Sequence, residues 1–152
     1  MPRVCSTSIY ERWQSPSANN NKTILAPPLA RITGIPANDG EKGGVYSFDF
    51  GPQQGHFQEG KRFLVVVQTN VLNQLDGYPN VIVVPTTTKG KPSPSFAKIE
   101  PSGANGLTKT TFAICNQILT MDKGRLKDLR GKISKEDIFQ VKEALKVALA
   151  IT

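Results

Sequence analysis

Residues 44–69, GVYSFDFGPQQGHFQEGKRFLVVVQT, contain two stretches that are typical of β-strands. Residues 45–50 are mostly β-branched or aromatic, and Gly51 and Pro52 then favour a turn. A loop follows, in which Gly55 and Gly60 enclose four residues that end with Glu59. Residues 62–69 are again rich in valine. We therefore predict two strands of an antiparallel sheet, joined by a loop that includes residues 55–60.

The sequence after this pair predicts more strands of the same kind. Runs of apolar and β-branched residues are separated by segments rich in glycine, proline, asparagine and aspartate, which favour turns. Strands linked by short turns, without helices between them, close best into a small barrel. The further strands are expected at residues 81–84, 96–100 and 110–119, with the first of these ending at Pro85.

The C-terminal segment predicts one amphipathic helix. Ser134 is a good N-cap, and Asp137 three residues later is an acidic near-match to a capping box. Ile133, before the cap, can pack on Ile138 as a hydrophobic staple. Helical spacing places five apolar side chains on one face, which we expect to cover an open side of the barrel: Ile138, Val141, Leu145, Ala148 and Leu149. The predicted fold class is mainly β with a C-terminal helix.

Residues 1–40 differ from the rest of the chain. They are rich in serine, asparagine and proline and show neither a helical nor an alternating period. We interpret them as a flexible N-terminal extension, and residues 41–152 as the folded domain. The two cysteines and the single histidine lack the spacing of a zinc site, so we predict no bound metal. Cys115 lies in an apolar stretch and is expected to be a buried free thiol.

Charge and hydropathy restrict the possible partners and location. The longest apolar runs are far shorter than the roughly 20 residues that a membrane span needs, and no signal peptide is apparent. We expect a cytoplasmic protein with no membrane contact. The net charge of +7 favours a polyanionic partner. Six cations lie close together, either on a solvated surface connection or on an edge that faces phosphate: Lys123, Arg125, Lys127, Arg130, Lys132 and Lys135.

Three segments of the chain, in order and without a large gap, resemble the MazF/PemK family of toxins, which are related in fold to CcdB and Kid. The matching residues are Gly44, Val45, Gly55, Gln58, Gly60, Arg62 and the run 64–68; then Val83 to Thr87; then Gly106, Leu107, Thr111, Asn116 to Ile118, Thr120, Asp122, Lys123 and Leu126. The resemblance covers residues 41–151. It implies a small SH3-like antiparallel barrel, a homodimer, and an acidic MazE-like antitoxin whose tail blocks the RNA site.

The same resemblance implies a toxin of a type II toxin–antitoxin system. Such a toxin is a sequence-specific endoribonuclease that cuts single-stranded mRNA without a metal or cofactor. The ribose 2′-hydroxyl attacks the phosphate and leaves a 2′,3′-cyclic phosphate and a 5′-hydroxyl. The alternative is a member of the same fold that does not cut RNA, either a nucleic-acid binder or a gyrase poison like CcdB.

The candidate catalytic residues follow from this chemistry. A guanidinium fork matches two phosphate oxygens, so Arg62 is the expected phosphate clamp and a candidate acid. Thr87 matches the family's threonine after the proline, and its hydroxyl can donate to a phosphate oxygen. His56 and Glu59 are weaker candidates for proton transfer. The family's usual glutamate is replaced here by Phe57, which leaves the identity of the base open.

Further residues are candidates for RNA contact. Phe57 can stack on a base, as in other single-strand binders. The threonines on either side of Thr87 are included because the register is uncertain by one residue, although strand alternation predicts that they point away from it. In the family, a glutamine and a serine lie near the RNA groove. Gln117 and Thr111 match them and lie on the strand expected at 110–119. The candidates are Phe57, Gln58, Lys61, Thr86, Thr88, Lys89, Thr111 and Gln117.

Overall fold

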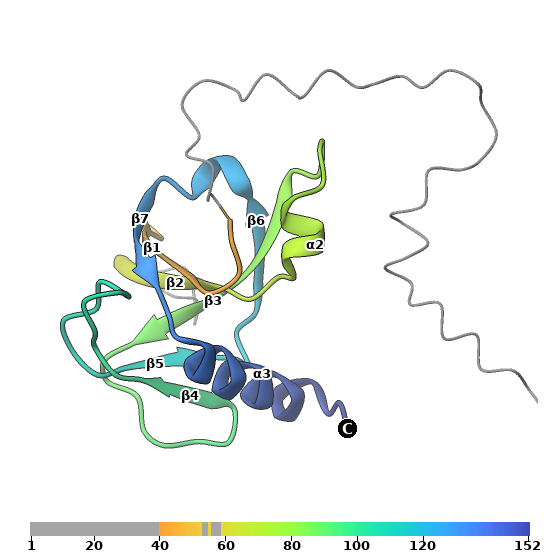
Figure 1. Ribbon diagram of the computed structural model, residues 1–152. Helices are drawn as coiled ribbons and strands as arrows, with labels where there is room; N and C mark the ends of the chain where they lie inside the picture. The colour runs from red at the N-terminus through yellow and green to blue at the C-terminus, as the bar shows by residue number, and fades with distance from the viewer. Residues whose placement is uncertain (1–39, 53–54, 56–58) are drawn as a thin grey trace, which may run out of the picture. The chain divides into compact units, whose positions relative to one another are not determined.

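The computed structural model describes residues 40–52, 55 and 59–152 of the chain (Figure 1). The N-terminal extension that the sequence predicts over residues 1–40 lies outside the described residues, apart from Gly40. Three of the site candidates, His56, Phe57 and Gln58, also lie outside them.

Within the described residues, seven strands form one antiparallel sheet, which is curled as in a small barrel (Figure 1). Its order is β4-β5-β3-β2-β1-β7, and β6 pairs with β3. The strands are β1 Gly44–Asp49, β2 Lys61–Val66, β3 Asn80–Thr87, β4 Phe96–Ile99, β5 Thr111–Ile114, β6 Leu119–Asp122 and β7 Asp128–Lys132. The helices are α2 Asn70–Asn73, the 3-10 helix η1 Lys123–Arg125, and α3 Lys135–Leu149. The predicted mainly β fold with a C-terminal helix is confirmed.

The predicted pair of strands at residues 44–69 is an antiparallel hairpin of β1 and β2, with Val45 opposite Val65. Two backbone hydrogen bonds close its loop: Phe50 N–H donates to the Gly60 carbonyl at 3.1 Å, and Gly60 N–H donates to the Gly51 carbonyl at 2.9 Å. Gly51 and Gly60 have φ values of 73° and 66°, which side chains disfavour. The two glycines therefore fix the point at which β2 begins.

The strand predicted to end at Pro85 continues to Thr87, so that boundary was wrong. Residues 80–83 of β3 pair with β6, and residues 86–87 pair with β5. Pro85 lies between these two sets, at the point where β3 changes its neighbour. A residue without an N–H is tolerated where the ladder is interrupted.

The single strand predicted at residues 110–119 was also wrong, because the chain turns within it. β5 ends at Ile114, Gln117 N–H donates back to the Ile114 carbonyl at 3.1 Å, and β6 begins at Leu119. The valine-rich strand is likewise shorter than predicted: it ends at Val66, and the Thr69 side chain accepts a hydrogen bond from Val71 N–H and caps α2.

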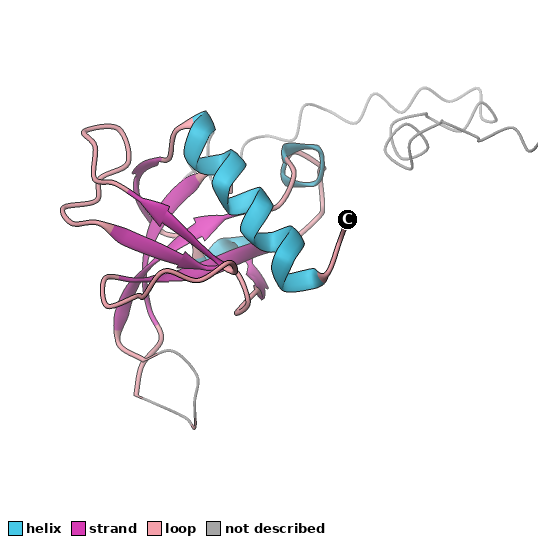
Figure 2. Cartoon of the chain, turned by 90° about the horizontal axis from the view of Figure 1, so that it is seen from below, coloured by secondary structure: helices cyan, strands magenta, loops and turns pink. Residues whose placement is uncertain are grey.

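Two apolar clusters lie on the two faces of the sheet, as strand alternation requires. Val45 and Val65 belong to the cluster that α3 covers, whereas Tyr46 and Leu64 belong to the other. Figure 2 shows α3 lying across the strands. Cys115 is fully buried in the cluster beneath α3 and is a free thiol, as predicted. Burial raises the pKa of this thiol to about 11.

Helix α3 confirms the predicted capping box, in which Ser134 and Asp137 exchange side-chain to backbone hydrogen bonds. Val141 and Ala144 are buried, but Leu149 is 52% exposed, so its place in the predicted apolar face was wrong. The reason is visible in Figure 1, where the C-terminal end of α3 extends past β4 and β5. No helix within the described ranges is both long and apolar enough to span a membrane.

Candidate active site

An open groove with a volume of about 490 Å³ lies where the β1–β2 loop meets the end of β3. Three cations and one carboxylate line it, so the groove favours an anion. Six of the sequence-predicted site residues meet there with two glycines of the loop. The lining residues are Gly51, Glu59, Gly60, Lys61, Arg62, Thr87, Thr88 and Lys89.

Arg62 is held at the start of β2 by the glycine-bounded loop. Its Nε donates to the backbone carbonyl of Glu59 at 3.1 Å, which fixes the base of the guanidinium. Among the described residues, no carboxylate forms an ion pair with Arg62. The outer N–H groups can therefore form the planar fork that binds two oxygens of a phosphate.

Thr87 and Thr88 line the groove together with Arg62. The Thr87 Oγ1 accepts a hydrogen bond from Lys89 N–H at 3.2 Å, so its own O–H can still donate to a ligand. Thr88 lies just beyond β3, where strand alternation no longer applies, and it is one of the exposed residues of the groove. Lys61 and Lys89 are exposed and supply the remaining positive charge.

Thr86, a candidate RNA contact, is almost entirely buried, although it lines the smaller cavity described below. Its side chain is 3% exposed, and its hydroxyl donates to the Phe63 carbonyl at 2.9 Å. This bond ties the end of β3 to β2, beside the residues that carry the groove. The adjacent threonines 86 and 87 therefore have separate roles, one in the fold and one in the groove.

These roles predict that substitution of one threonine lowers cleavage and substitution of the other lowers stability. We expect Thr87→Val to lower RNA cleavage about tenfold, because one donor to the phosphate is lost, with thermal stability unchanged. Thr86→Val leaves the partly buried Phe63 carbonyl without its donor and is expected to cost about 1–3 kcal/mol of stability. Cleavage rates and urea unfolding of both variants check this. Equal effects of the two variants on cleavage and stability contradict the assignment.

A smaller cavity of about 170 Å³ shares a wall with the groove. Ser47 and Phe63 line it beside Arg62 and Thr87, and neither was among the predicted site residues. The sequence feature that could have identified them is the hairpin register, which places Ser47 directly opposite Phe63 on neighbouring strands. Pairing β1 with β2 through their loop identifies both positions once the loop ends are known.

Two other predicted RNA contacts do not line these cavities. Thr111 is 2% exposed, and its hydroxyl donates to the Lys109 carbonyl at 2.8 Å, so the prediction of an RNA contact there was wrong. Gln117 is exposed, but it lies in the turn between β5 and β6 rather than on a strand.

The basic stretch 123–135 is engaged within the domain rather than gathered at the groove. The Lys123 ammonium donates to the Asn73 carbonyl at 2.8 Å, and burial lowers the pKa of Lys123. The Arg125 guanidinium lies 4.9 Å from the centre of the Phe48 ring. Ion pairs join Arg130 to Asp128 and Lys132 to Glu41. Of the two interpretations of this stretch, these contacts favour the surface connection over the edge that faces phosphate.

Comparison with known proteins identifies the family to which the chain belongs. The sequence profile of the PemK-like, MazF-like toxins of type II toxin–antitoxin systems matches residues 41–149. The chain belongs to this family. The match includes every groove residue and both strands of the hairpin that holds Arg62.

Curated relatives and solved structures agree with this assignment. "Endoribonuclease MazF" of Staphylococcus saprophyticus is 32% identical over 112 residues, covering 72% of this chain and 91% of the relative. "Endoribonuclease MazF" of Staphylococcus epidermidis is 34% identical over 113 residues, with the same coverage. A mycobacterial endoribonuclease solved in complex with its cognate antitoxin superposes with a TM-score of 0.61 at 25% identity, covering 74% of this chain and 96% of that one. MazF from Deinococcus radiodurans, at 21% identity, shares the fold with a TM-score of 0.57, covering 72% of this chain and 96% of its own.

Proposed function

We propose that this toxin is an endoribonuclease that cuts single-stranded mRNA in the cytoplasm without a metal ion. The observation that carries the proposal is the groove that Arg62 and Thr87 line together, in which Arg62 has no carboxylate ion-pair partner among the described residues. A guanidinium held in this way is suited to a phosphate diester. Relatives that are named endoribonucleases, with about one third of their residues identical, support the same activity.

The proposed reaction uses the RNA's own nucleophile. The ribose 2′-hydroxyl attacks the adjacent phosphorus, the bond from phosphorus to the 5′-oxygen breaks, and the products are a 2′,3′-cyclic phosphate and a 5′-hydroxyl. Arg62 binds two non-bridging oxygens as negative charge develops on them, and Thr87 donates to a phosphate oxygen. Glu59 is the carboxylate in the groove, and we assign it the role of accepting the 2′-hydroxyl proton. The leaving 5′-oxygen takes up a proton as its bond to phosphorus breaks, and Arg62 is the candidate acid that donates it.

The test of this proposal is cleavage of a long single-stranded RNA by the purified protein in EDTA. We expect discrete fragments that end in a cyclic phosphate, identified by mass spectrometry. An RNA with a 2′-deoxynucleotide at the mapped cleavage site is expected to stay intact, because its nucleophile is missing. If several RNAs bind but none is cut, the non-catalytic alternative on the same fold replaces this proposal.

We also propose that an acidic antitoxin inhibits the toxin by placing its tail in the groove. Lys61, Arg62 and Lys89 are the charges that carboxylates of such a tail meet, and they are the same charges that bind RNA phosphates. Structural relatives solved with an antitoxin support a partner of this kind. Binding of RNA and of the tail is therefore mutually exclusive in this proposal.

A homodimer is the proposed assembly, with α3 at its interface. Phe139 is 61% exposed and Val147 is 56% exposed on the same outer side of the helix. A two-fold axis across this side can bury both residues against their copies. We expect light scattering at micromolar concentration to give a dimer for the wild type and a monomer for Phe139→Glu. The adjacent exposed Gln140 provides the control, Gln140→Glu, which is expected to remain dimeric; a monomeric wild type contradicts the proposal.

A further inference from the structure

A second cavity, of about 180 Å³, lies between the end of β2 and helix α3. Its lining is apolar except for two lysines, and it includes Val67, Ile133, Ile138, Leu145, Lys42 and Lys142. It is separate from the RNA groove: Val66 and Arg62 are four residues apart on β2, roughly 13 Å at the usual rise of a strand. An open apolar cavity of this size is uncommon in a well-packed domain and is suited to receiving an apolar group.

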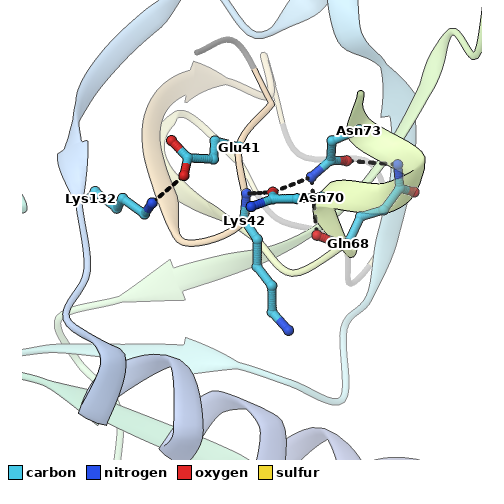
Figure 3. A network of polar contacts seen from close by, with 6 residues as sticks. All are labelled: Glu41, Lys42, Gln68, Asn70, Asn73 and Lys132. Atoms are coloured by element: carbon cyan, nitrogen blue, oxygen red, sulfur yellow. Dashed lines mark hydrogen bonds and ion pairs between the residues drawn. The ribbon is translucent and has the colours of Figure 1, made fainter. Parts of the chain in front are cut away.

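The position of Lys42 at this cavity is set by a network of polar contacts (Figure 3). Lys42 N–H donates to the Asn70 Oδ1 at 2.7 Å, and Asn73 Nδ2 donates to the same oxygen at 3.2 Å. On the other side, Glu41 forms an ion pair with Lys132 of β7. Figure 3 shows the Lys42 side chain extending away from this network toward α3. The backbone is thus fixed while the ammonium remains at the cavity.

The second lysine comes from the helix itself. Lys142 is exposed on α3, next to the buried Val141 and one turn before Leu145. In the part of the chain that the structure describes, no carboxylate forms an ion pair with Lys42 or Lys142. The cavity therefore combines an apolar interior with two ammonium groups that have no acidic partner within the described residues.

We propose that this cavity is a second anchor for the antitoxin, distinct from the groove that its tail blocks. The occupant is an acidic segment that places one leucine-like or aromatic side chain among Val67, Ile138 and Leu145, and carboxylates beside Lys42 and Lys142. The net charge of +7 favours such a segment over a second copy of this basic chain. This inference rests on the proposed toxin function.

The anchor has a consequence for inhibition. A segment held at the cavity leaves Arg62 and Thr87 open, so occupation of the cavity alone does not stop RNA cleavage. It keeps the tail near the groove, which raises the effective concentration of the tail there. The antitoxin thereby holds the toxin more tightly than the groove contacts alone allow, without any further contact to the catalytic residues.

The test uses a fluorescein-labelled synthetic peptide in which single leucines are flanked by glutamates, and a matched peptide with serine in place of leucine. Fluorescence anisotropy is measured with the full chain. Lys142→Glu reverses a charge beside the cavity, and Leu145→Trp fills the cavity. Each variant is expected to weaken binding about tenfold. Lys135→Glu, on the same helix but away from the cavity, is the charge-matched control and is expected to bind normally. The serine peptide is expected to bind about tenfold more weakly to the wild type.

Each outcome separates this inference from the function on which it rests. All three variants are expected to cut RNA at the wild-type rate, which also shows that they are folded. Equal peptide binding by the wild type, Lys142→Glu and Leu145→Trp overturns the anchor, as does complete displacement of the peptide by single-stranded RNA, which places it in the groove. A wild type that binds the peptide as expected but leaves RNA intact overturns the proposed ribonuclease and leaves the peptide site standing.

Discussion

Arg62→Ala is expected to lower kcat/KM for RNA cleavage by about 10²-fold or more, equivalent to about 3 kcal/mol of transition-state stabilisation. The guanidinium is held at the start of β2 by its bond to the Glu59 carbonyl, and it is the group in the groove that can bind two phosphate oxygens at once. Charge on those oxygens grows as the 2′-oxygen attacks, so the loss falls on the reaction rate more than on RNA binding. Initial rates in EDTA on one defined RNA measure it.

Two further variants define what Arg62 supplies. Arg62→Lys keeps the charge but not the planar fork, so its rate is expected to lie between those of the wild type and Arg62→Ala. Lys91→Ala removes an exposed cation from the loop after β3, outside the lining of the groove, and is expected to leave the rate unchanged. Cleavage by Arg62→Ala at the wild-type rate, with wild-type thermal unfolding, removes Arg62 from the proposed mechanism.

Local signals predicted the parts of the fold that depend on neighbouring residues. The β1–β2 pair was predictable because β-branched and aromatic residues are bounded by turn glycines at 51 and 60. The start of α3 was predictable because Ser134 and Asp137 satisfy each other's backbone groups within one turn. Such interactions need no knowledge of distant parts of the chain.

Boundaries that depend on distant partners were not predictable in the same way. β3 continues through Pro85 because it exchanges β6 for β5 there, and the pairing of these strands is a tertiary property. The basic stretch became β7 because β1 offers it an edge, although its own composition is that of a surface connection. Leu149 has the helical spacing of a core residue but lies where the strands no longer reach.

The candidate site shows the same division. Arg62 and Thr87 could be placed in one groove from the resemblance alone, and the structure brings them together. The sequence could not show that Thr86 and Thr111 are buried with their hydroxyls bonded to carbonyls, because burial is decided by the packing of other strands. Ser47 was missed for a related reason, since its position beside Phe63 follows from the register of the hairpin.

Gly131→Ala is expected to be the most destabilising of the substitutions considered for the fold, at about 2–4 kcal/mol. β7 passes so close to the preceding loop that a methyl group at Gly131 meets the Ala104 carbonyl oxygen and lies 2.7 Å from the carbonyl carbon of Asn105. Both are backbone atoms, which cannot rotate away as a flexible side chain can. The same contact includes the hydrogen bond from Lys132 N–H to the Ala104 carbonyl at 2.8 Å. Urea unfolding of the purified protein measures the loss.

The loop on the other side of this contact has little freedom to move, which is why a large effect is expected. Asn105 is 1% exposed, accepts from the backbone N–H groups of Ser102 and Leu107 at 3.0 Å each, and donates to the Glu100 carbonyl at 2.9 Å. Shifting the loop to admit a methyl group weakens these buried bonds. Gly103→Ala is the matched control, because a methyl group there meets no atom within 4 Å, and its stability is expected to stay within about 0.5 kcal/mol of the wild type. Equal stability of the two variants shows that the loop can move away from β7 without losing the Asn105 bonds.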